Sequence, residues 1–122
     1  MTNQEIYEKV GDIGVLTTTY ICMGKADGDF TEDEFLNVYR LVSVLSDNPK
    51  SAIEDTLNVI NELSFQEKID FAGAGLRMLS DKLDSKTKEI IMASLAKIAE
   101  SDGVISDEEQ DFFADVKKIL KA

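Results

Sequence analysis

Two stretches of this sequence, Asp27-Gly-Asp-Phe-Thr-Glu-Asp-Glu34 and Asp102-Gly-Val-Ile-Ser-Asp-Glu-Glu109, share the pattern D-G-x-[F/I]-[T/S]-x-x-E and lie 75 positions apart. Apolar residues before and after both stretches match at the same offset. The matched pairs are Leu16 with Ile91, Tyr20 with Leu95, Met23 with Ile98, Val38 with Phe113, Leu41 with Val116 and Leu45 with Leu120. The sequence therefore predicts two helix-turn-helix units, at approximately 12–46 and 87–121, that pack about a pseudo-twofold axis.

Helical periodicity continues through the rest of the chain, without strand-like alternation. With 122 residues, the chain has room for one domain around a single core. We therefore expect an all-α fold, a compact bundle of about seven helices in a single domain that covers residues 1–122. The expected helices span about 2–10, 13–26, 31–45, 49–63, 64–83, 85–102 and 106–120.

Capping residues predict where several of these helices begin. A Ser or Thr followed three residues later by Glu can form a capping box, in which each side chain accepts a hydrogen bond from the other residue's backbone N–H. We expect such boxes at Thr31 with Glu34, Ser64 with Glu67, and Ser106 with Glu109. Asn48 is the expected N-cap before Pro49, and Asp84 or Ser85 is the expected cap of the sixth helix.

The helix expected at 64–83 contains the unusual run Ala72-Gly-Ala-Gly75. Glycine in a helix interior is roughly 1 kcal/mol less favourable than alanine. A close approach of another helix explains two such residues better than a hinge does. We therefore expect a helix to cross closely at Gly73 and Gly75.

The chain is strongly acidic, with 13 Lys and Arg residues against 24 Asp and Glu residues and a net charge of -11. Segments 27–34 and 100–111 together hold 11 of these acidic residues. Such a charge repels phosphate backbones and anionic lipid surfaces. We therefore expect no nucleic-acid partner, and instead expect divalent cations or basic protein surfaces.

The sequence also gives an expectation about the compartment. Its N-terminus lacks the basic and apolar regions of a signal peptide, and no apolar run approaches the ~18 residues of a membrane-spanning helix. The single cysteine, Cys22, cannot form an internal disulfide. We expect a cytoplasmic protein without direct membrane insertion.

The repeated stretch contains only the second half of an EF-hand calcium loop, namely the Gly and the Glu six positions later. A full loop would begin at Met23 and Ile98, which are apolar and in phase with the preceding helices. Two interpretations of the stretch stay open. It is either a well-capped turn or a ligand site, and the second would explain why Asp27 and Asp102 stand at the unfavourable end of a helix dipole.

At Lys25-Ala-Asp-Gly28 and Glu100-Ser-Asp-Gly103, each followed by x-[F/I]-[T/S]-x-x-E, the chain resembles the TerB-like family, all-helical domains named after tellurite-resistance proteins. The resemblance implies a role in metal-linked stress responses through protein complexes, and no established catalytic activity. It also implies a divalent-cation site made from Asp27, Glu34, Asp102 and Glu109. Because the chain has no histidine, the ligands would be hard oxygens, which favour Ca²⁺, Mg²⁺ or Mn²⁺ over Zn²⁺.

These features lead us to expect a small cation-binding regulatory module. The alternative is a metal-independent interaction module that docks a basic or helical partner. An enzyme is not expected, since the chain has no histidine for a triad and no Walker or dinucleotide glycine pattern. Cys22 lies in an expected helix with no histidine to activate it, so we expect a partly buried, unreactive thiol.

Overall fold

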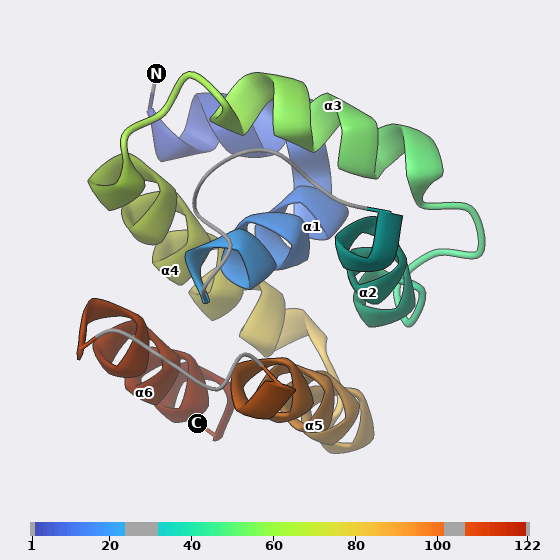
Figure 1. The fold of residues 1–122 in the computed structure, drawn as a ribbon, viewed down its shortest axis with the longest axis vertical. Helices are drawn as coiled ribbons and strands as arrows, with labels where there is room; N and C mark the ends of the chain where they lie inside the picture. Colours follow the sequence, from blue (N-terminus) through green and yellow to red (C-terminus); the bar gives the residue numbers. More distant parts are fainter. Residues whose placement is uncertain (1, 24–31, 102–106, 122) are drawn as a thin grey trace.

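The computed structural model describes residues 2–23, 32–101 and 107–121, and this part of the chain forms six helices without a strand (Figure 1). The helices are α1 (Asn3–Cys22), α2 (Glu32–Val42), α3 (Lys50–Ile60), α4 (Phe65–Lys82), α5 (Ser85–Ser101) and α6 (Asp107–Lys121). The expected all-α class is confirmed. None of these helices is both long and apolar enough to cross a membrane.

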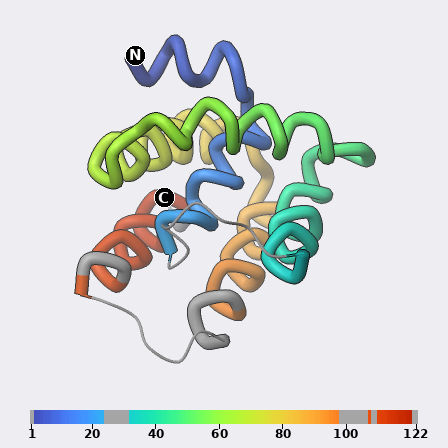
Figure 2. The backbone as a smooth tube through the Cα atoms, turned by 45° about the horizontal axis from the view of Figure 1, so that its top comes forward, coloured from blue at the N-terminus to red at the C-terminus, as the bar shows by residue number. Residues whose placement is uncertain are grey.

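Helix α1 bends sharply at Gly11 (Figure 2). Gly11 has φ 65° and ψ -163°, a conformation that glycine adopts without the strain a Cβ would introduce. The segments expected as two helices are therefore one interrupted element, and the expected count of about seven is not confirmed. The second expected helix also ends four residues early: Met23 leaves the helical conformation, and its N–H donates to the carbonyl of Tyr20.

The second half of α1 lies in the middle of the molecule (Figure 1). Every residue from Gly14 to Met23 is buried, and α1 packs mainly against α3 and α4. The burial includes three consecutive threonines, Thr17, Thr18 and Thr19. Each threonine hydroxyl donates to the carbonyl four residues earlier, at 2.7 to 2.8 Å, so none of these buried groups lacks a hydrogen bond.

The predicted capping of α4 and α5 is confirmed. The Ser64 hydroxyl accepts from the Glu67 N–H at 3.1 Å, and the Glu67 carboxylate accepts from the Ser64 N–H at 3.0 Å. A carboxylate oxygen of Asp84 accepts from the Thr87 N–H at 2.7 Å.

At the start of α3 the expected cap is wrong. Pro49, not Asn48, occupies the N-cap position and makes no side-chain cap bond. The reason is that Pro49 already has near-helical angles, φ -86° and ψ 0°, and its carbonyl accepts from the Ile53 N–H. The capping boxes expected at Thr31 and Ser106 lie outside the described residues.

The two glycines of α4 have different surroundings. A Cβ on Gly75 would lie 2.5 Å from Cγ2 of Val15 in α1, so the expected close crossing is confirmed there. A Cβ on Gly73 would meet only the Nη1 atom of Arg77, at an ordinary 3.7 Å, among the described residues. The expectation of a close crossing is therefore wrong for Gly73, which is half-buried at the molecular surface.

Two helix pairs correspond to the predicted repeat. Helix α1 contacts α2, α5 contacts α6, and α2 also contacts α5 across the two units. Helices α2 and α6 begin at Glu32 and Asp107, which are equivalent positions at the offset of 75. The described helices do not establish the pseudo-twofold relation between the units.

Candidate functional site

The four candidate ligands are unevenly covered by the structure. Asp27 and Asp102 lie outside the described residues. Glu34 is half-buried in the first turn of α2, and Glu109 is in the first turn of α6, where its side chain lies outside the described set. The prediction that these carboxylates meet in one site therefore stays a prediction. Among the described side chains, no three His, Cys, Asp or Glu residues are grouped closely enough to hold a metal ion.

The helix ends next to the first acidic stretch define its electrostatic setting. Glu32, Asp33 and Glu34 all lie in the first turn of α2, where the helix dipole favours negative charge. Helix α1 has no basic residue in its last turn. Three carboxylates therefore lie together in the first turn of α2, and the last turn of α1 carries only uncharged residues.

A cation does approach the end of α1 from another helix. Lys68 of α4 is only 8% exposed, and its ammonium lowers the pKa of the Cys22 thiol. Burial has the larger and opposite effect, and it raises the pKa of Cys22 to about 12. Cys22 is fully buried, more so than expected, and is protonated at neutral pH, so it does not supply a thiolate nucleophile.

A polar cluster joins the two halves of α1 to the end of α4. The Lys82 ammonium donates to the Tyr7 hydroxyl at 2.8 Å and lies 3.5 Å from a carboxylate oxygen of Asp12. The Tyr7 hydroxyl donates in turn to Asp12. Because Tyr7 and Asp12 stand on opposite sides of Gly11, this cluster holds the bend in place. Sequence reasoning missed it, since the contact depends on how α4 packs across α1.

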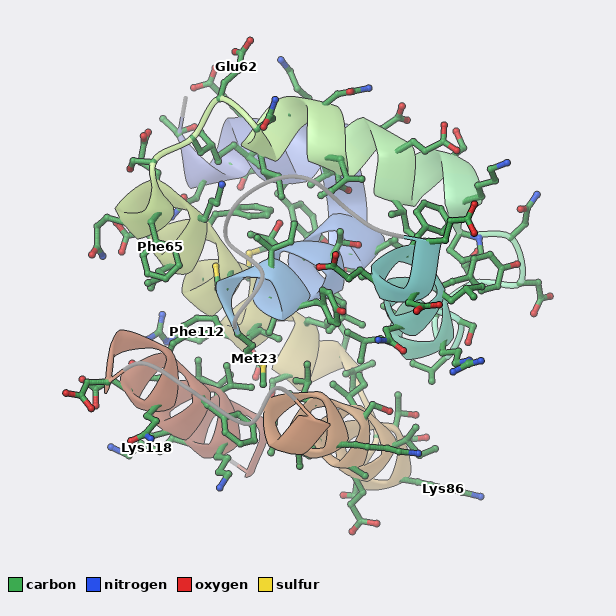
Figure 3. The ribbon with its side chains drawn as sticks, in the orientation of Figure 1. Met23, Glu62, Phe65, Lys86, Phe112 and Lys118 are labelled. Carbon is green, nitrogen blue, oxygen red and sulfur yellow. The ribbon has the colours of Figure 1, made fainter. Side chains whose placement is uncertain are left out.

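A groove between α4 and α6 was also missed. It consists of two adjoining hollows, of about 500 and 510 Å³, whose walls share Arg77, Asp115 and Ile119. Figure 3 shows Phe112 on the side of α6 toward α4, and Lys118 farther along α6. The sequence signal that could have revealed this groove is a second set of residues at helical spacing on α4, which lies apart from the buried face of that helix.

The fold and the two acidic stretches define a small acidic all-α domain. The sequence model of the family described as tellurite resistance protein TerB matches residues 15–122, which is nearly the whole chain. The chain therefore belongs to the TerB family. No curated protein and no solved structure matches the chain.

Proposed function

We propose that this protein is a divalent-cation-binding regulatory module that acts in metal-linked stress responses in the cytoplasm. The proposed ligands are the acidic residues of the two repeated stretches, Asp27, Glu34, Asp102 and Glu109, and the cation is Ca²⁺, Mg²⁺ or Mn²⁺. One observation carries the proposal: the TerB family match over residues 15–122 includes both D-G-x-[F/I]-[T/S]-x-x-E stretches.

The positions of the two glutamates support their equivalence. Glu34 is the third residue of α2 and Glu109 is the third residue of α6. Backbone oxygens and water would complete the coordination shell of a cation bound by such carboxylates. Carboxylates gathered in one place repel one another unless a proton or a cation bridges them. A chain with a net charge of -11 strengthens this preference for a cation.

Thermal unfolding and calorimetry with and without cation test the proposal. Because a ligand that binds only the folded state stabilises it, 100-fold excess of free cation over Kd should add about 2.7 kcal/mol to the free energy of unfolding. We expect Ca²⁺ or Mn²⁺ to raise Tm in the wild-type protein and to raise it much less in Asp27→Asn and Asp102→Asn.

Asp55→Asn is the matched control, because Asp55 is an exposed carboxylate on α3. It should keep the wild-type response to cation. The absence of both binding heat and a Tm shift at millimolar cation would reject the proposal. An equal loss of response in the control would show a general charge effect in place of a site.

A further inference from the structure

The groove between α4 and α6 follows a long face of α4. The α4 residues that line the groove lie between Gln66 and Asp81 and recur every three or four residues, so they form one stripe along the helix. At 1.5 Å per residue, this stripe extends for about 22 Å, or roughly four helical turns. It is a second face of α4, since α1 packs against the stripe that contains Gly75 and Leu76. A third helix fits such a groove between two helices.

Gly73 in the floor of the groove indicates a close approach from outside. Glycine destabilises a helix interior relative to alanine, and at Gly75 the packing of Val15 accounts for it. At Gly73 no described residue would clash with a Cβ, so packing among the described helices does not account for this glycine. Together with Ala74 it keeps this part of the groove free of large side chains, and the half-buried Ile69 and Ile119 add apolar surface around it.

The charges of the groove select the kind of helix. Asp70, Asp81 and Asp115 outnumber Arg77 and Lys118 in its walls. No side-chain ion pair of Arg77, Asp81 or Asp115 occurs within the part of the chain that the structure describes, so these groups are available to a partner. A second copy of the chain would add another charge of -11 to this surface. The electrostatic complement is therefore a basic helix from a different protein.

We infer that the α4–α6 groove docks an amphipathic helix of a partner protein, with a small residue against Gly73 and basic side chains opposite Asp70, Asp81 and Asp115. This inference does not depend on the proposed cation site. It assigns a specific surface to the alternative function, in which the protein docks a basic or helical partner.

The probe for this inference is a displayed library of 18-residue peptides, built on an amphipathic alanine and lysine helix with one face randomised. Selection is performed on the whole chain in EDTA, so that the result is independent of the cation site. We expect enrichment of basic sequences with a small residue at the centre of the apolar face. The affinity of the enriched peptides, measured by fluorescence anisotropy, should fall at least tenfold in Gly73→Leu and in Asp115→Lys.

Matched controls separate docking from loss of fold. Ala93→Leu places the same leucine on an exposed position of α5, and Asp55→Lys reverses an exposed charge on α3. Both should bind within twofold of wild type, and circular dichroism verifies that all four variants are folded. A library without enrichment, or peptides that bind Gly73→Leu as tightly as wild type, would overturn the inference. A dimer in light scattering that Gly73→Leu dissociates would assign the groove to a second copy and overturn it as well.

Discussion

Gly75 of α4 and Val15 of α1 lie so close together that a Cβ on Gly75 would sit 2.5 Å from Cγ2 of Val15. Both residues are buried, and Val15 stands in the central half of α1. The neighbouring side chain is short and branched, so it cannot move aside as the end of a flexible side chain can. The distance between α1 and α4 therefore depends on the absence of a side chain at this position.

Gly75→Ala should destabilise the protein despite the higher helix propensity of alanine. Overpacking in a well-packed core typically costs about 1–3 kcal/mol, which exceeds the roughly 1 kcal/mol gained from propensity. Subtracting the gain from the cost, we expect a net fall of up to about 2 kcal/mol in the free energy of unfolding, measured by urea denaturation.

Gly73→Ala is the matched control for this prediction. Its Cβ would make only an ordinary contact with Arg77, so alanine should raise the free energy of unfolding by roughly 0.5–1 kcal/mol. Equal effects of the two substitutions would contradict the difference in packing that separates these glycines.

The Cys22 thiol should be protected from alkylation in the native protein. Burial raises the pKa of Cys22 to about 12, so the fraction present as thiolate at pH 8 is very small, and the buried sulfur is also sterically shielded. We expect iodoacetamide to modify Cys22 only as fast as the protein unfolds, measured by mass spectrometry over time in increasing urea. Rapid modification without urea, at the rate of a short unfolded peptide, would contradict the observed burial.

The interactions of Lys82 should stabilise the protein less at alkaline pH. The hydrogen bond to Tyr7, and next the charge of Asp12, raise the pKa of Lys82. A raised pKa means that the folded state retains the proton longer than the unfolded state. The contribution is therefore fully present below the unfolded-state pKa, near 10.4, and is lost as pH rises through the folded-state value.

Urea denaturation of wild type and Lys82→Met between pH 8 and pH 12 measures this loss. The stability difference between the two proteins should be largest at the lower pH and should shrink toward the upper end. Lys86→Met, at an exposed position of α5, is the control and should show no such narrowing. A difference that stays constant across the range would show that the charge of Lys82 does not carry its contribution to stability.

Local sequence signals predicted the helices well because their causes are local. The Ser64 and Glu67 capping box requires only that two side chains lie three residues apart, and the structure contains it. Apolar spacing likewise located the buried residues Leu76, Ile91 and Leu95. The N-cap of α3 was predicted wrongly because Asn48 and Pro49 can both begin a helix. The choice between them depends on the backbone angles at the turn.

Features that depend on several helices were not predictable in this way. Thr17 to Thr19 are polar in composition, and only the central position of α1 makes them core residues. The α4–α6 groove depends on how far apart two helices pack. The candidate cation site has the same character, since the sequence identifies its four carboxylates but not the distance between the two stretches. That distance stays a prediction.

Substitution of Lys68, which is not one of the proposed ligands, tests where the cation binds. Its ammonium acts on Cys22 at the end of α1, and Asp27 follows Met23 by only four residues, at most about 14 Å of extended chain. A positive charge this close to the first acidic stretch opposes a divalent cation. Lys68→Met removes the charge and retains the buried stem, and we expect it to tighten cation binding roughly twofold to tenfold in calorimetry at low salt. Lys86→Met controls for net charge and should change Kd less than twofold. Unchanged or weaker binding in Lys68→Met would contradict a cation site within reach of the Lys68 charge.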